Sequence, residues 1–118
     1  MKIREIQQAL QAKLLSSEEM LDRQIDGACG ADLMSDVLAS NKHNTLLLTG
    51  LCTLQSLRTA EMADIIAIVF VRNKVPDESM LELAEQLDIA VLTTRLPMFE
   101  ACGRLYATGL RESSGERR

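Results

Sequence analysis

One uninterrupted apolar run, residues 63–71, stands out in the hydrophobic pattern of the chain. It contains Asp64 near its start and leaves through Arg72-Asn73-Lys74, and β-branched residues dominate it. It lacks the apolar–polar alternation of a strand with one solvent-facing side. A strand of this kind must be covered on both faces, as in a parallel sheet wrapped by helices. The run therefore predicts the central strand of a small α/β domain.

Shorter apolar segments predict the remaining strands, and recurring apolar positions predict the helices. The expected strands cover residues 13–16, 22–30, 45–49 and 89–93. The expected helices cover residues 2–11, 31–38, 53–62, 77–87 and 97–109. Three strand–helix alternations in the second half favour parallel pairing with right-handed crossovers. The expected fold is thus a small, mostly parallel sheet of about five strands flanked by helices.

Residues at the helix ends support these boundaries. Asp32, Thr53 and Asp77 are expected as N-caps, because their side-chain oxygens can accept from unpaired amides of the first turn. Pro97 suits a first turn and Gly109 suits a C-terminal cap.

The apolar positions of three helices group on one face of each. The expected inner faces of the first two are Leu54, Leu57 and Ala60, and Met80, Leu81, Ala84 and Leu87. In the last helix, Phe99, Cys102 and Tyr106 are expected on one face, with Met98 and Leu105 alongside. Gly103 inside the last helix costs about 1 kcal/mol relative to Ala, which predicts that something packs very close there.

The length of 118 residues fits one domain over residues 1–110, followed by a polar tail, 111–118, that is expected to be disordered. Hydrophobic residues make up 47% of the chain but aromatic residues only 3%, so the core must be aliphatic. The scarcity of stacking side chains and the net charge of −4 argue against nucleic-acid binding.

Two further patterns concern location. The longest apolar run is well short of the roughly 20 residues that a membrane span needs, and the start of the chain lacks the apolar core of a signal peptide. Cys29, Cys52 and Cys102 are odd in number and widely spaced, which fits a reducing cytoplasm.

Motifs of catalysis and cofactor binding are absent from the sequence. Gly27-Ala28-Cys29-Gly30 lacks the full dinucleotide fingerprint and is interpreted as a turn, although its glycines also suggest close backbone approach in a strand. His43 is either a base or phosphoacceptor or, as we expect, an exposed loop residue. Cys52 precedes a helix N-terminus, where a thiolate is favoured and would be a candidate nucleophile, but ordinary burial is the expected state. The cysteines cannot form a zinc site by themselves. We therefore expect no enzyme activity, no cofactor and no metal.

The strand ends offer a candidate ligand site. In an open α/β sheet, ligands bind beyond the carboxyl ends of the strands, where helix N-termini direct free amides. Here these ends combine hydroxyls, a glycine and cations, which suits an anion or a nucleotide phosphate. The candidate ligand-binding residues are Thr49, Gly50, Thr53, Arg72, Lys74 and Thr94. The alternative is that they only cap helices and line solvated loops.

Six segments match one known family in their order along the chain. They are residues 21–35, 46–50, 63–70, 76–84, 89–94 and 99–106. This succession resembles the DRTGG domain, which is similar to the N-terminal domain of HPr kinase. The resemblance implies a dimer-forming regulatory α/β module without catalysis of its own. Such domains stand beside CBS domains in regulated pyrophosphatases and in some phosphotransacetylases. Stand-alone versions in anaerobic bacteria accompany hydrogenase or signalling genes.

The Asp-Arg and Thr-Gly-Gly residues from which the family takes its name are missing at the expected places. Its Asp-Arg is expected after Gly50, where this chain has Leu51-Cys52, and its Thr-Gly-Gly is expected at Val71-Arg72-Asn73. Any ligand that those residues bind in relatives is therefore altered or absent here. Two hypotheses follow: a cytoplasmic, homodimeric regulatory module that binds a partner protein or small ligand, or a nucleotide or anion sensor. Its dimer surface is expected on the last helix, around Met98, Phe99 and Tyr106.

Overall fold

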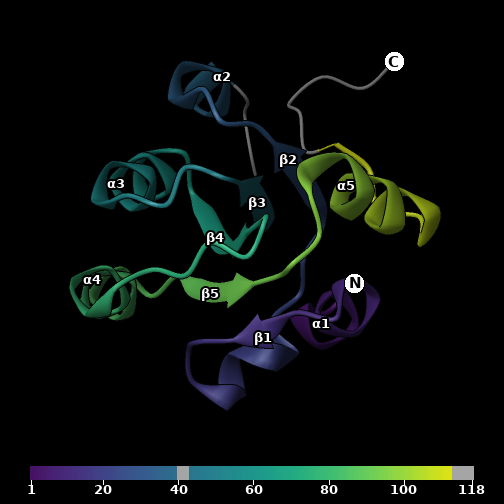
Figure 1. Ribbon diagram of the computed structural model, residues 1–118, viewed down its shortest axis with the longest axis horizontal. Helices are drawn as coiled ribbons and strands as arrows, with labels where there is room; N and C mark the ends of the chain where they lie inside the picture. Colours follow the sequence, from purple (N-terminus) through teal and green to yellow (C-terminus); the bar gives the residue numbers. More distant parts are fainter. Residues whose placement is uncertain (40–42, 113–118) are drawn as a thin grey trace.

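The computed structural model, which describes residues 1–39 and 43–112, contains one five-stranded sheet (Figure 1). The strand order is β1-β5-β4-β3-β2. The strands are β1 (Lys13–Leu14), β2 (Gly27–Gly30), β3 (Thr45–Thr49), β4 (Ile65–Phe70) and β5 (Ala90–Thr93). Strands β2, β3, β4 and β5 run parallel, and only β1 pairs antiparallel, with β5. This confirms the predicted α/β fold with a mostly parallel sheet.

Five α-helices and one 3₁₀ helix surround the sheet. They are α1 (Ile3–Leu10), η1 (Glu18–Asp22), α2 (Met34–Ala39), α3 (Leu54–Met62), α4 (Glu78–Leu87) and α5 (Met98–Ala107). Helices α2, α3 and α4 lie on one side of the sheet, and α1 and α5 lie on the other (Figure 1). The expected strand at 22–30 is shorter than predicted: Asp22 belongs to η1, and β2 spans Gly27–Gly30, so this glycine-containing segment is a strand and not the expected turn.

Strand β4 lies at the centre of the sheet and is covered on both faces, as its sequence predicts. Ile68 and Phe70 belong to the apolar cluster under α2, α3 and α4, whereas Ala67 and Val69 belong to the cluster under α1 and α5. Because successive side chains of a strand point to opposite faces, an unbroken apolar run fills both clusters at once. The aliphatic core predicted from composition is therefore two cores that share one sheet.

Two of the three predicted N-caps are confirmed. The Thr53 hydroxyl accepts from Ser56 N at 3.3 Å, and the Asp77 carboxylate accepts from Met80 N at 3.0 Å. These acceptors satisfy amides that an α-helix leaves unpaired in its first turn. The hydrogen bonds from Met80 N and from the Ser79 side chain lower the pKa of Asp77. At the far end of the domain, Gly109 has φ +103°, which suits the expected C-terminal cap.

The predicted cap at Asp32 is wrong. Helix α2 begins at Met34, and the Asp32 carboxylate accepts from Thr49 and Gly50 instead. Those groups lie 17 and 18 residues further along the chain, where a local capping rule cannot find them. Parallel pairing of β2 with β3 brings them beside Asp32.

The inner faces of α3 and α5 also differ from the prediction. Leu57 and Ala60 are buried, but Leu54 is exposed and Ser56 takes an inner position. The Ser56 hydroxyl donates to Thr53 O at 2.7 Å, so its burial leaves no polar group unpaired. In α5, Phe99 and Tyr106 are exposed whereas Cys102 is half-buried, so the face that the sequence assigns to these three residues is only partly covered. A β-carbon at Gly103 would meet no atom of the described residues within 4 Å, so the expected close packing there is wrong.

The C-terminal part of the described chain follows the edge of β2. Arg111 O accepts from Ala28 N at 3.0 Å, and Glu112 forms a parallel bridge with Ala28. The rest of the expected tail, residues 113–118, lies outside the described residues. Within the described ranges, every helix is too short or too polar to cross a membrane.

Candidate functional site

The carboxyl ends of β2, β3 and β4 meet at one edge of the sheet, because these strands are parallel neighbours. Asp32 follows β2, Thr49 ends β3 with Gly50 directly after it, and Arg72 follows β4. The sequence predicts Thr49, Gly50 and Arg72 as ligand-binding residues, and the structure brings these three together. We call this group, with Asp32, the carboxyl-edge cluster.

The carboxylate of Asp32 lies at the centre of the carboxyl-edge cluster. Its Oδ1 accepts from Gly50 N at 2.7 Å and from Thr49 Oγ1 at 3.1 Å. Its Oδ2 lies 4.0 Å from Arg72 Nη2. An amide, a hydroxyl and a guanidinium are the donors that a bound anion would use. The chain thus supplies its own anion, and sequence reasoning misses it because the partners are remote.

The turn that carries Arg72 has an unusual backbone. Arg72 and Asn73 have φ +57° and +58°, and Lys74 N donates to Val71 O at 3.2 Å. This is the pattern of a type I′ turn, which favours Gly or Asn at both central positions. Two glycines of the Thr-Gly-Gly that the resemblance expects here would adopt it without strain. In this chain, Arg72 N and Asn73 N donate to Leu96 O and Thr94 O, both at 2.8 Å, and hold the turn in place.

The other predicted ligand residues have separate contacts. Thr53 caps α3, and Thr94 is buried with its hydroxyl donating to Leu10 O at 2.8 Å. The exposed Lys74 accepts through its carbonyl from Thr93 Oγ1 at 2.6 Å. The hydroxyls of Thr53 and Thr94 are therefore already used in capping and packing. Ligand binding by the six residues stays a prediction.

The candidate nucleophile and base have ordinary surroundings. Burial raises the pKa of the Cys52 thiol, the charge of Asp77 raises it further, and Lys74 acts in the opposite direction. A raised pKa favours the unreactive thiol at neutral pH. His43 is exposed, as the loop interpretation expects. Among the described residues, no group of three or more His, Cys, Asp or Glu side chains is arranged to hold a metal ion.

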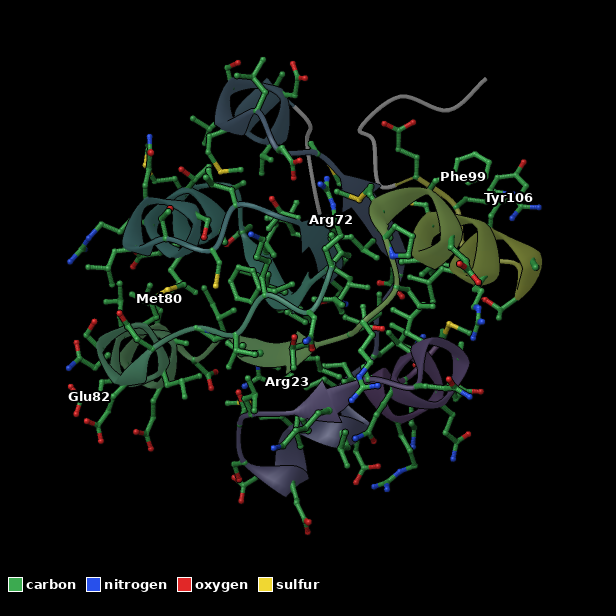
Figure 2. All side chains as sticks on the ribbon, viewed as in Figure 1. Arg23, Arg72, Met80, Glu82, Phe99 and Tyr106 are labelled. Atoms are coloured by element: carbon green, nitrogen blue, oxygen red, sulfur yellow. The ribbon has the colours of Figure 1, made fainter. Side chains whose placement is uncertain are left out.

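A second candidate site is the outer face of α5, defined by Phe99, Gly103 and Tyr106. The Phe99 side chain is 92% exposed and Tyr106 is 61% exposed. Figure 2 shows both pointing away from the sheet. Arg111 places its guanidinium carbon 3.8 Å from the centre of the Tyr106 ring, which orients that ring. Gly103 lies between the two rings, one helical turn from each, and leaves a shallow gap.

The inner face of α5 packs tightly on the sheet. A β-carbon at Gly30, the last residue of β2, would lie 2.8 Å from Cys102 Sγ and 3.4 Å from Met98 Sδ. Close approach therefore occurs at Gly30, as the glycines of the second strand suggest, and not at Gly103. Burial raises the pKa of the Cys102 thiol, which is consistent with its expected packing role.

Comparison with known proteins supports the fold. No family model matches the chain, and no curated protein matches it. Among solved structures, it is similar to the CBS and DRTGG domains of the regulatory region of Clostridium perfringens pyrophosphatase, complexed with the activator diadenosine tetraphosphate. The TM-score is 0.71 at 17% identity, over 94% of this chain and 50% of that chain. The chain thus spans about half the length of this neighbour, and the likeness establishes a CBS/DRTGG-like fold.

Proposed function

We propose that this chain is a regulatory module without catalysis of its own, and that it forms a homodimer through the outer face of α5. The observation that carries the proposal is the exposure of Phe99 and Tyr106. The chain has only three aromatic residues and no Trp, and two of the three are exposed on one helix face. Aromatic side chains are enriched at the centres of protein interfaces, where their burial contributes much of the affinity.

The geometry of α5 favours a second copy as the occupant. In a twofold dimer the same surface patch meets itself, so one α5 crosses another. The gap at Gly103 can then receive an aromatic ring of the partner copy. Each covered aromatic side chain buries roughly 150–250 Å². Four such side chains supply the core of an interface of the standard size of about 1,600 Å².

Light scattering coupled to size exclusion tests the dimer. We expect a dimer at tens of micromolar, and the double variant Phe99→Ser/Tyr106→Ser should weaken association at least tenfold. The matched control is Met62→Ser/Val75→Ser, which removes two exposed apolar side chains from other surfaces. A wild-type monomer at 100 µM, or equal weakening by the control, would contradict the proposal.

The regulatory role is supported by the structural neighbour, which is itself a regulatory region. Burial raises the pKa of the Cys52 thiol and favours its unreactive form, which agrees with a module that does not catalyse. We further propose that the regulated target belongs to signalling or hydrogenase-linked energy metabolism, as the family resemblance implies. The odd number and wide spacing of the three cysteines support a reducing, cytoplasmic location. Purification of tagged protein from the native cell, with identification of bound enzymes, tests the target.

A nucleotide or anion sensor is the second candidate function, favoured by the carboxyl-edge cluster. The neighbour's complex with diadenosine tetraphosphate is consistent with a phosphate-bearing ligand. Here the ligand must displace the Asp32 carboxylate, then accept from Thr49 and Gly50 and pair with Arg72. Because the cluster already holds a negative charge, we expect weaker binding than at an open site.

A thermal-shift panel tests the sensor. The ligands are inorganic phosphate, ATP and diadenosine tetraphosphate, and saturation at 100 times Kd should stabilise the protein by about 2.7 kcal/mol. Arg72→Gln should remove the shift, whereas Arg58→Gln, an exposed cation on α3, should keep it. The absence of a shift across the panel counts against this second function and leaves the dimer proposal unaffected.

A further inference from the structure

A groove of about 630 Å³ lies between η1 and α4, beside the edge strand β1. Figure 1 shows the two elements that line it, α4 and the helical turn that follows β1. It is separate from both candidate sites, because it contains no residue of the carboxyl-edge cluster or of α5. We call it the η1–α4 groove.

The floor of the η1–α4 groove is apolar and held in place. Leu15, Met20 and Leu81 line it, and each is half-buried against one of the two cores. The backbone beside Leu15 is fixed to β5, because Leu15 N donates to Val91 O at 2.8 Å. On the same stretch, Ser16 Oγ accepts from Val91 N at 2.8 Å. The floor is therefore a preformed surface on which apolar side chains can pack.

The rim of the groove carries charge of one sign. None of its ten lining residues is basic, and five are acidic: Glu19, Glu78, Glu82, Glu85 and Asp88. Asp88 is paired with Arg23. In the described part of the chain, the four glutamates are exposed and have no ion-pair partner within 4.0 Å. Figure 2 shows Glu82 on the outer side of α4.

The placement of these glutamates opposes the stability of α4 itself. Glu78 and Glu82 are four residues apart, and Glu82 and Glu85 are three apart, so like charges are neighbours on one helix face. Glu85 also lies near the negative end of the helix dipole, and the last turn of α4 has no basic residue. Arg23, which donates to Asp88 O at 2.7 Å, is a cation at that end of the helix, but among the described residues no cation within 4.0 Å offsets the repulsion among the three glutamates. A cationic occupant of the groove would compensate for it directly.

The chemistry of the groove selects one kind of occupant. Within the described residues, the carboxylates form no group that can hold a metal ion, and the apolar floor is of no use to a small cation. The acidic rim repels nucleic acids and anionic lipid surfaces. The volume accommodates several side chains. We propose that the η1–α4 groove binds a cationic amphipathic segment of a partner protein, with apolar side chains on the floor and Lys or Arg at the rim. This rests on the proposed regulatory role, since it names the chemistry of the regulated partner.

Three labelled peptides of 14 residues test the proposal by fluorescence anisotropy at 150 mM NaCl. One is an amphipathic Lys/Leu helix, one replaces every Lys by Glu, and one replaces every Leu by Ser. We expect micromolar binding of the Lys/Leu peptide. The Lys/Ser peptide should bind at least tenfold more weakly, because it cannot use the floor, and the Glu/Leu peptide should not bind.

Charge reversal locates the binding. Glu82→Lys/Glu85→Lys should weaken the binding of the Lys/Leu peptide at least tenfold. Asp36→Lys/Glu61→Lys makes the same change in net charge on exposed carboxylates of α2 and α3, and should alter binding less than twofold. Equal loss in both variants would show general electrostatic attraction and overturn the proposal. So would the absence of Lys/Leu binding, or equal binding of the Lys/Ser peptide. Light scattering on the same samples reports the dimer separately, so failure of the groove and failure of the dimer are distinguishable.

Discussion

The central strand β4 and the outer face of α5 carry the two phenylalanines of the chain in opposite environments. Phe70 is fully buried, whereas Phe99 is 92% exposed. The exit of the neighbouring strand β3 is equally self-contained, since the Asp32 carboxylate accepts from Thr49 and Gly50. The fold therefore accounts for the side chains around β4 and leaves the aromatic pair of α5 without an internal role. Groups that the fold already uses are weaker evidence of function than groups that it leaves uncovered.

The largest expected effect is at the centre of the sheet. Phe70→Ala should lower the free energy of unfolding by about 3–5 kcal/mol, because it leaves a cavity beneath α3 and α4 that close packing cannot refill. Urea unfolding followed by circular dichroism measures this. A loss below about 1 kcal/mol would show that the surroundings of Phe70 relax freely, which contradicts a tightly packed core.

Removal of the internal anion comes next. Asp32→Ala should lower the free energy of unfolding by about 2 kcal/mol, because Gly50 N and Thr49 Oγ1 lose a charged acceptor. Inorganic phosphate should then raise the melting temperature of the variant more than that of the wild type. Asp36→Ala, an exposed carboxylate on α2, is the matched control and should change little. Equal phosphate shifts in all three proteins would mean that Asp32 does not occupy an anion site.

The contact between β2 and the inner face of α5 gives a third prediction. Gly30→Ala should lower the free energy of unfolding by about 1–2 kcal/mol, since its β-carbon would meet Cys102 Sγ at 2.8 Å. Adding Cys102→Ala should recover most of the lost stability. A double-mutant cycle by urea unfolding measures the coupling. Additive losses in the cycle would indicate that the two positions do not press on each other.

The outer side of α5 should respond in the opposite direction. Gly103→Ala should stabilise the chain by about 0.5–1 kcal/mol, because Ala favours the helix and its β-carbon meets no described atom within 4 Å. Unfolding should be measured at submicromolar concentration, below the expected dimer range. Ala107→Gly, an exposed position of the same helix, should cost a similar amount and serves as the control.

The smallest effect on stability is expected at the other phenylalanine. Phe99→Ala should change the free energy of unfolding of the monomer by less than about 0.5 kcal/mol, because the ring is already in solvent. The same substitution should weaken the dimer. A large loss of monomer stability would mean that Phe99 packs within its own chain.

Local patterns predicted much of the fold, and their failures have a common cause. The run through β4 predicted burial on both faces, and Thr53 and Asp77 were found as caps because their partners lie three residues away. Asp32 has the residue type of a cap as well, yet its partners are on another strand. Gly103 and Gly30 are alike in sequence, but only Gly30 faces a neighbouring helix.

Hydrophobic periodicity and caps act over a few residues, so the mostly parallel α/β sheet can be predicted from the sequence. Which side chains remain uncovered depends on how the elements pack. The orientation of α5 leaves Phe99 and Tyr106 in solvent, and the packing of α4 beside η1 places the glutamates of α4 at the rim of an apolar floor. These outcomes depend on contacts between segments far apart in the chain, and local periodicity contains no information about such contacts.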